Sequence, residues 1–384
     1  MNKKIDVAIY VHEFLPEVGH SRAMIETLKH FPAEQVNNLH IIAYDICNIA
    51  DVIKQYENKV VIHQCPKIFY RPFLIKMIWF YIYCFYIDAF KLDRNVKKIG
   101  IGIASLSAKY INIQFIHQEW EPIYFKYISM PFYKYVYKKI LFFVFRKIED
   151  HIYNQSNVKF SVLSQFETDY IKKKFSVQDK NIITNYSGVN FDRFKLLDQT
   201  KLVSKERIIE IFPELVNLDE NKVTYLFIGA LERKGVNFVI REFLKVTDAQ
   251  LIIIGRPEGS SSINIPTSPD IFYIPFTKDV HLFYQYSDVF LFPTLYEPFG
   301  LVILEAASMG LNVLTTKKQV GASELLADIK GIHLFEGSEQ FNIIPIRAPL
   351  SYSDKLAVRE KVMKRMQPYS WNKTGSNFWK LLND

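Results

Sequence analysis

The sequence predicts an α/β protein with two doubly wound domains, each a parallel sheet packed against helices. Short runs that are apolar throughout alternate with amphipathic stretches, which is typical of strands covered on both faces. The alternation stops at a polar stretch, residues 198–221, and then restarts. The length of 384 residues agrees, because soluble domains commonly run to about 100–200 residues.

Each expected strand is a short apolar run. In the first half the strands are expected at Ile5–Val11, Leu39–Tyr44, Lys59–His63, Ile99–Ala104, Ile111–His117 and Lys159–Leu163. In the second half they are expected at Val223–Gly229, Gln250–Gly255, Ile271–Ile274, Asp288–Phe292 and Asn312–Thr316. Helices are expected at Ser21–Phe31, at Gln165–Phe175 with Ser164 as cap, and from near Lys234, Lys278, Gly300 and Gly321.

These elements predict an N-terminal domain at 1–195 and a C-terminal domain at 196–366. Open α/β sheets bind ligands outside the carboxyl ends of their strands. We therefore expect the two domains to face one another across a ligand-binding cleft.

The composition excludes several classes of protein. Hydrophobic residues at 49% and charged residues at 23% argue against disorder. Three cysteines without a C-x-x-C pair imply neither a disulfide framework nor a zinc site, so a reducing compartment fits. The net charge of +8 suits nucleic acid, an anionic membrane or a phosphorylated substrate.

Residues 288–324 contain the most informative pattern. A buried strand leads into a loop that carries Glu297 and Gly300, and a helix starts at about Leu301. Free N–H groups and the positive end of a helix dipole form an anion site there. Glu305 lies within the apolar part of this helix, where an unpaired carboxylate is costly. Vicinal hydroxyls would be natural partners; the alternative is a solvated helix residue.

The run EPFGLVILEA closely resembles the E-x7-E signature of the retaining glycosyltransferases of family 4, which have the GT-B fold. The resemblance implies that Glu297 faces the transferred sugar and that Glu305 binds the ribose hydroxyls. It also implies that the donor diphosphate is held by the backbone amides of Phe299, Gly300, Leu301 and Val302. Asn312 departs from the family, which usually has proline there.

The run YLFIGALERKG, residues 225–235, resembles the family's G-R-x-x-x-K-G pattern. Gly229 ends the strand, and Ala230 replaces the arginine. Arg233 and Lys234 precede a helix start, where two cations suit a diphosphate. Arg233 resembles the substitute guanidinium of lipopolysaccharide core glucosyltransferases. The alternative is a solvated basic turn.

The run YSWNKTGSNFWKLL resembles the closing helix of the family, which implies a helix at 367–384 that crosses back to the N-terminal domain.

Two further contacts follow from the resemblance. The run FLPEVGHSR has Val18–Gly19 where the family usually has two glycines, so Gly19 is the candidate donor contact. His117, at the expected carboxyl end of a strand, resembles the histidine that contacts the donor sugar. A histidine with a purely structural role is the alternative.

No D-x-D triplet and no G-x-G-x-x-G run occurs in the sequence. We therefore expect no metal and no cofactor, with Arg233, Lys234 and helix ends neutralising the donor diphosphate instead.

Two stretches are rich in aromatic residues. Met77–Ile87 is apolar for eleven residues, short of the roughly 20 that span a membrane. Residues 122–147 interleave aromatic rings with lysines, as in helices that lie at a membrane surface. Binding of single-stranded nucleic acid, or a core helix with a basic face, are the alternatives.

The resemblance implies transfer of a hexose from a nucleotide diphosphate sugar, with a UDP-sugar as first choice, and retention of configuration. The expected acceptor is a lipopolysaccharide, a glycolipid or another surface glycan, and no nucleic acid partner is expected. The catalytic candidates are Glu297, His117, Lys234 and Arg233. The expected location is the cytoplasm, on the inner face of the cytoplasmic membrane and in contact with anionic lipid. The alternatives are a catalytically silent nucleotide-sugar-binding protein at the membrane, or a sugar synthase or phosphorylase with the same fold.

Overall fold

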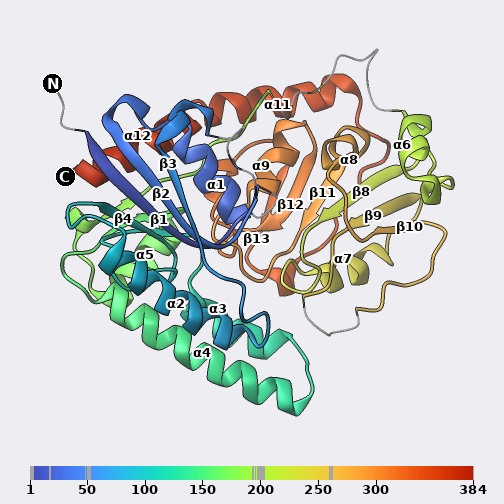
Figure 1. Ribbon diagram of the computed structural model, residues 1–384. Helices are drawn as coiled ribbons and strands as arrows, with labels where there is room; N and C mark the ends of the chain where they lie inside the picture. The colour runs from blue at the N-terminus through green and yellow to red at the C-terminus, as the bar shows by residue number, and fades with distance from the viewer. Residues whose placement is uncertain are drawn as a thin grey trace. The chain divides into compact units, whose positions relative to one another are not determined.

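The computed structural model describes residues 4–16, 19–47, 49, 53–192, 194, 196, 204–258 and 263–383. The chain forms two compact units, each built on one parallel sheet with helices packed against it (Figure 1). Unit 1 comprises Met1–Glu121, Phe132–Gly188 and Tyr369–Asp384, and unit 2 comprises Pro122–Pro131 and Val189–Pro368. The predicted α/β class with two doubly wound sheets is confirmed.

The unit 1 sheet has seven parallel strands in the order β3-β2-β1-β4-β5-β6-β7. The strands are β1 (Ile5–Phe14), β2 (Val36–Ile46), β3 (Val60–Gln64), β4 (Lys97–Ile101), β5 (Tyr110–Ile113), β6 (Lys159–Val162) and β7 (Ile182–Thr184). The helices are α1 (Gly19–Leu28), α2 (Phe73–Phe90), α4 (Phe132–Tyr153), α5 (Gln165–Phe175) and the closing helix α12 (Trp371–Asn383). Phe378 and Leu381 of α12 belong to the same buried cluster as Ile9 and Ile41. The C-terminal helix is thus part of the unit 1 core.

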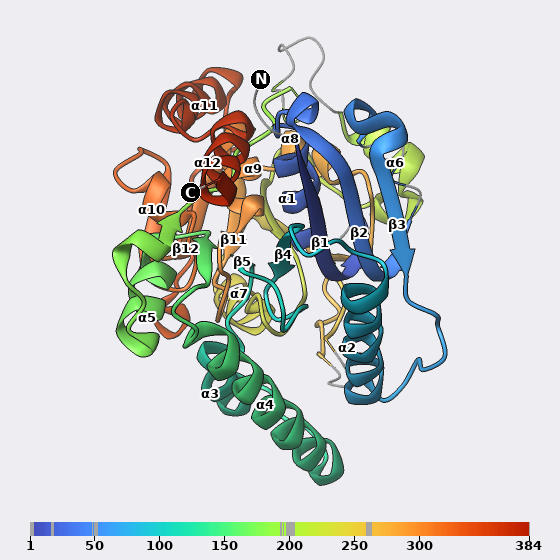
Figure 2. The same cartoon turned by 60° about the vertical axis from the view of Figure 1, so that its left-hand side comes forward.

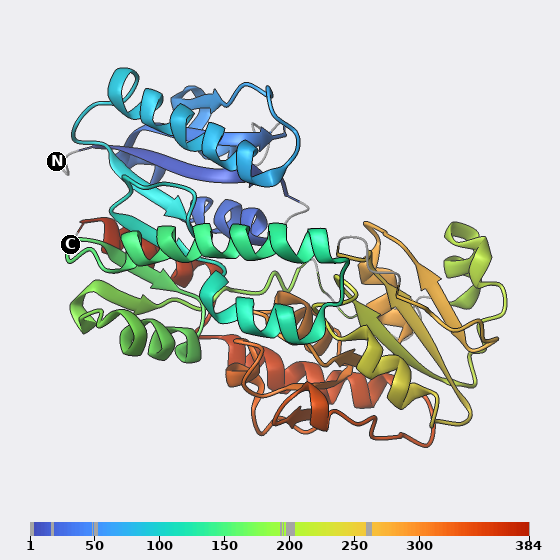
Figure 3. The same cartoon turned by 90° about the horizontal axis from the view of Figure 1, so that it is seen from below.

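The helices of unit 1 cover both faces of its sheet. α1 packs beside α12, whereas α2 and α4 lie on the opposite face (Figure 3). The amino end of α2 contacts α4, since the main-chain N–H of Leu74 donates to the hydroxyl of Tyr137 at 3.2 Å.

The unit 2 sheet has six parallel strands in the order β10-β9-β8-β11-β12-β13. The strands are β8 (Val223–Ile228), β9 (Ala249–Ile254), β10 (Ile271–Ile274), β11 (Val289–Phe292), β12 (Asn312–Thr316) and β13 (Ile332–Phe335). The helices are α6 (Lys205–Ile211), α7 (Val236–Phe243), α8 (Val280–Tyr286), α9 (Leu301–Ser308), α10 (Ser323–Leu326) and α11 (Tyr352–Met366). The order of the strands reverses between β8 and β11, where doubly wound sheets bind ligands.

Unit 2 also includes Pro122–Pro131, which contains the second half of α3 (His117–Tyr127). The Tyr127 hydroxyl donates to Glu339 Oε1 at 2.7 Å, and its ring centre lies 6.1 Å from that of Phe238 on α7. This segment therefore packs against unit 2, although the residues on both sides of it belong to unit 1.

Some expected details were wrong. β5 ends at Ile113, and His117 is the first residue of α3 rather than the last of a strand. Ser164 occupies the N-cap position of α5, but its hydroxyl makes no capping hydrogen bond. The stretch expected as a plain connection contains α6, while residues 198–203 within it lie outside the described residues. The strands β7 and β13 were not expected.

Among the described residues, α2 alone is long and apolar enough to cross a membrane by length and composition. This is weak evidence, because the core helix of a soluble protein passes the same test.

Candidate active site

The loop after β8 brings two cations to the reversal point of the unit 2 sheet. Gly235 makes this possible: a Cβ there would lie 2.1 Å from the carbonyl oxygen of Pro293 at the end of β11. The two loops thus touch through main-chain atoms, which only glycine permits, and φ is +80° at this position. Gly229, the other expected glycine, lies against the side chain of Lys234.

Lys234 is the more buried of the two cations, with 9% of its side chain exposed. Its ammonium group forms an ion pair with Glu297 Oε2 and lies 5.1 Å from the centre of the Phe292 ring. Burial, and then the neighbouring guanidinium of Arg233, lower the pKa of Lys234 well below its usual range. An additional anion at this point would stabilise the charged form of the lysine.

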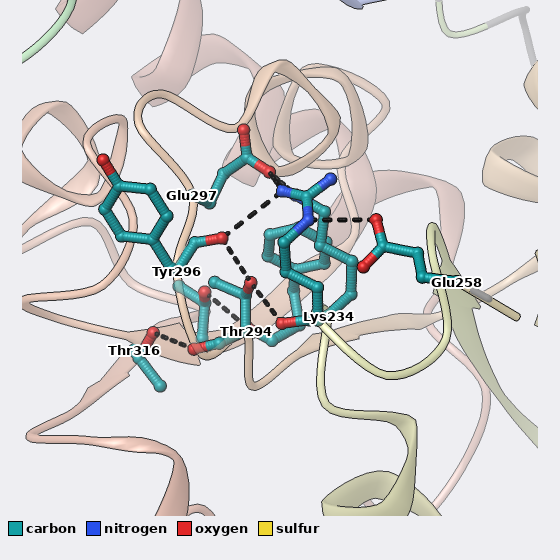
Figure 4. Close-up of polar contacts among 9 residues, drawn as sticks. Lys234, Glu258, Thr294, Tyr296, Glu297 and Thr316 are labelled. Carbon is teal, nitrogen blue, oxygen red and sulfur yellow. Dashed lines mark hydrogen bonds and ion pairs between the residues drawn. The ribbon is translucent and has the colours of Figure 1, made fainter. Parts of the chain in front are cut away.

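Arg233 pairs with two carboxylates from different loops, those of Glu258 and Glu297, which are labelled in Figure 4. Its Nε pairs with Glu258 Oε1 at 3.1 Å, and its terminal nitrogen lies 3.5 Å from Glu297 Oε2. The same nitrogen donates to the carbonyl of Tyr296 at 3.4 Å. Both predicted cations therefore converge on one oxygen of Glu297. Glu258 was not expected from the sequence, because no family pattern quoted for this chain includes it.

The loop that carries Glu297 is fastened to the loop after β12. The Glu297 N–H donates to Gln319 O at 2.7 Å, and the Ala322 N–H donates to Phe299 O at 2.7 Å. Gly300, with φ of +91°, is the N-cap residue of α9, and no side chain of the described residues caps this helix. The Phe299 side chain is buried, so a ligand contact by Phe299 at this helix start would be made by its main chain. Leu301 and Val302 are half-buried.

Glu305 lies on α9 just over one turn from its start and is 4% exposed. The solvated alternative is therefore wrong. The hydroxyl of Tyr284 on α8 donates to Glu305 Oε2 at 3.3 Å. Tyr284 was missed because it lies in a stretch with no recognisable motif. A buried carboxylate with a hydroxyl partner can also accept hydrogen bonds from a diol.

The other two candidates belong to unit 1. Gly19 is the exposed first residue of α1, and the adjacent Val18 lies outside the described residues. His117 begins α3 and lies against the Phe145 ring, with ring centres 4.3 Å apart. The fully buried Glu149 accepts hydrogen bonds from the main-chain N–H of His117 at 2.6 Å and from its Nδ1 at 2.9 Å.

Glu149 also accepts from the Gln118 N–H at 3.0 Å, so it caps α3 as well as holding the imidazole. This capping explains why the chain turns into a helix at His117 instead of extending β5. The Nε2 atom of His117 is left as the ring nitrogen available to a ligand. The signal for Glu149 was the acidic pair Glu149–Asp150 near the end of an otherwise aromatic and basic helix, which the sequence analysis did not use.

Within the described residues, no group of three or more His, Cys, Asp or Glu side chains is arranged to hold a metal ion. In unit 2 the structure brings Arg233, Lys234 and Glu297 into contact beside the start of α9, with Glu305 further along that helix.

Part of the chain is similar in sequence to known glycosyltransferases, and nearly the whole chain is similar to them in fold. Residues 222–341 match the family of glycosyl transferases group 1. WaaG, a glycosyltransferase involved in lipopolysaccharide biosynthesis, has a crystal structure that matches 97% of this chain and 95% of its own, with a TM-score of 0.63 and 15% identity. The chain has the GT-B fold. HepE of Anabaena in complex with UDP-glucose matches 99% of both chains, with a TM-score of 0.63 and 12% identity.

Among curated proteins, a lipopolysaccharide 1,2-N-acetylglucosaminetransferase of Salmonella typhimurium is 24% identical over 246 residues. That match covers 58% of the present chain and 61% of the Salmonella protein. The curated relatives are matched over less than two thirds of their own length. The four charged side chains of unit 2 that the sequence predicted, Arg233, Lys234, Glu297 and Glu305, lie inside the matched family segment.

Proposed function

We propose that this protein is a retaining hexosyltransferase of the family 4 type that uses a nucleotide diphosphate sugar, with UDP as the nucleotide. The convergence of Arg233 and Lys234 on Glu297 beside the start of α9 carries the proposal. Two cations and a helix amino terminus form a site for a diphosphate, and the buried Glu305 lies where a ribose diol could meet it.

In the proposed reaction the bond between the anomeric carbon and the diphosphate oxygen breaks. The acceptor hydroxyl oxygen bonds to the same carbon, and its proton leaves with the diphosphate. Arg233, Lys234 and the main-chain amides at the start of α9 stabilise the charge that develops on the leaving group. No metal is required in this scheme.

Glu297 changes its partner in this scheme. The donor diphosphate replaces Glu297 as the counter-ion of Lys234, and the released carboxylate then faces the sugar. His117, held by Glu149, contacts the sugar through Nε2 and positions it for attack.

The relatives support the choice of substrates. HepE was crystallised with UDP-glucose, and the Salmonella relative is named as a transferase that acts on lipopolysaccharide. We infer that the acceptor is a lipopolysaccharide, a glycolipid or another surface glycan. We place the protein in the cytoplasm, on the inner face of the cytoplasmic membrane, with the basic and aromatic helix α4 against anionic lipid.

A thermal-shift screen of the purified protein against UDP, GDP, ADP and their sugars tests the donor. A ligand at 100 times its dissociation constant stabilises the native state by about 2.7 kcal/mol. The proposal expects stabilisation by one diphosphate class, and then release of that diphosphate when acceptor is added. Binding without turnover on any glycolipid acceptor would favour a silent binding protein, and phosphorolysis would favour a phosphorylase.

A further inference from the structure

Helix α2 has apolar side chains on two opposite sides. The inward stripe is buried against the unit 1 sheet and consists of Met77, Phe80, Cys84 and Ile87. The outward stripe is exposed to between 42% and 73% and consists of Ile75, Ile78, Ile82, Phe85, Tyr86 and Phe90. At 3.6 residues per turn the two stripes point in nearly opposite directions. A soluble helix normally has polar residues on its outer face.

The charges of α2 do not lie on the outward stripe. The helix contains one cation and one acid, and both are paired within unit 1. Lys76 contacts Asp45 at 2.8 Å, and Asp88 contacts Lys98 at 2.9 Å. The outward stripe of α2 is therefore an uncharged apolar surface.

The surroundings of α2 are cationic. Exposed Arg71 precedes the helix, and exposed Lys91 and Arg94 follow it, against a single exposed acid, Asp93. Helix α4, which lies on the same side of the unit 1 sheet as α2 (Figure 2), carries further lysines. Its Phe145 ring lies 6.3 Å from that of Phe73 on α2. An apolar stripe between cations is complementary to acyl chains below anionic phosphates. A second copy of this chain would instead bring like charges together at both ends of the helix.

We propose that α2 lies flat in the surface of an anionic phospholipid membrane, with its outward stripe below the phosphates and the cations of its ends among them. The helix lies along the surface instead of crossing it, because its inward stripe packs on the sheet. This proposal rests on the proposed membrane location and adds that α2, a separate element from α4, is the helix that inserts into the membrane. It does not depend on the transfer chemistry.

Vesicle co-sedimentation of the full chain tests this, with mixed phosphatidylglycerol and phosphatidylcholine. The variant Ile78→Gln/Ile82→Gln/Phe85→Gln removes the stripe while keeping good helix formers. The matched control, Ile211→Gln/Val216→Gln/Leu244→Gln, removes exposed apolar side chains from unit 2. We expect at least tenfold weaker vesicle binding for the α2 variant, or about 1.4 kcal/mol, and no change for the control.

Insertion is measured directly with Phe85→Trp. Its fluorescence, corrected for the native tryptophans, should be quenched by lipids brominated in the acyl chain, whereas that of Leu244→Trp should not.

Equal vesicle binding by the α2 variant and wild type would overturn the proposal. If the α4 lysine variant described below then lost binding, α4 alone would make the membrane contact. A dimer that the α2 variant dissolves, with vesicle binding unchanged, would identify a second copy as the occupant. An α2 variant that unfolds at nearly the same temperature as wild type shows that any loss of vesicle binding is not caused by unfolding.

Discussion

The carboxylate of Glu149 holds both the main-chain N–H and the Nδ1 of His117, at 2.6 Å and 2.9 Å. One fully buried acid thereby fixes the start of α3 and the orientation of the imidazole together. A donated Nδ1–H leaves Nε2 as the acceptor in the neutral ring. Glu149 is thus a positioning residue for the proposed contact of His117 with the sugar.

Glu149→Gln should lower kcat about tenfold or more, because the amide cannot accept all three hydrogen bonds that the carboxylate accepts. Affinity for free UDP should stay unchanged, since the nucleotide contacts are in unit 2. The double variant Glu149→Gln/His117→Ala should be no slower than His117→Ala alone, because groups that act through one another are not additive. Asp169→Asn, on α5, is the control. Additive losses in the double variant would show that Glu149 acts independently of His117.

Glu305→Ala and Glu305→Gln should each weaken UDP binding while the fold survives. The carboxylate accepts from two hydroxyls at once, which neither substitute can do. Calorimetry should give at least a tenfold loss of affinity, equal to about 1.4 kcal/mol. Tyr284→Phe removes only the protein partner of Glu305 and should have a smaller effect. Unchanged UDP affinity in both Glu305 variants would refute the ribose contact.

Arg233→Ala and Lys234→Ala should each reduce activity at least tenfold, which corresponds to about 1.4 kcal/mol of transition-state stabilisation. Arg241→Ala, which removes a cation from the surface of α7, is the control and should leave activity nearly unchanged. Steady-state assays with and without EDTA complete the test. Activity that persists in EDTA supports a donor neutralised by side chains, and abolition by EDTA would require a metal.

UDP binding should be coupled to proton uptake. Burial lowers the pKa of Lys234. In the free protein, Lys234 therefore loses its proton at a lower pH than an ordinary lysine does. A bound diphosphate favours the charged form, and UDP affinity should therefore fall as pH rises through the lowered pKa. Calorimetry in buffers of different ionisation enthalpy measures the protons taken up. Lys234→Arg should abolish the uptake, because a guanidinium stays charged.

Replacing Lys134, Lys138 and Lys139 on α4 with glutamate should release the protein from anionic vesicles. Each cation near such a surface contributes about 1 kcal/mol, and salt screens the effect. Co-sedimentation across a salt series checks this against Lys172→Glu/Lys173→Glu/Lys174→Glu on α5. Turnover of a soluble acceptor analogue should be spared. If the α4 variant binds anionic vesicles as tightly as wild type does, these lysines are only the solvated face of a core helix.

The sequence predicted what depends on local pattern. Continuous apolar runs located most strands, and the spacing of Glu297 and Glu305 located the loop and the buried helix. What it missed depends on contacts between distant residues. Glu149 lies far along the chain from His117, Glu258 reaches Arg233 from another loop, and Tyr284 reaches Glu305 from another helix. None of these pairs produces a periodicity that one segment could show.

The assignment of Pro122–Pro131 to unit 2 has a practical consequence for anyone who dissects or recombines this protein. A fragment that starts at Val189 lacks Tyr127, so Phe238 on α7 loses its aromatic neighbour and Glu339 loses its hydrogen-bond donor. Such a fragment would expose apolar surface on the helix that follows Lys234. A chimera that exchanges the nucleotide-binding half between homologues should therefore carry this segment with it, although it is encoded within the other half of the gene.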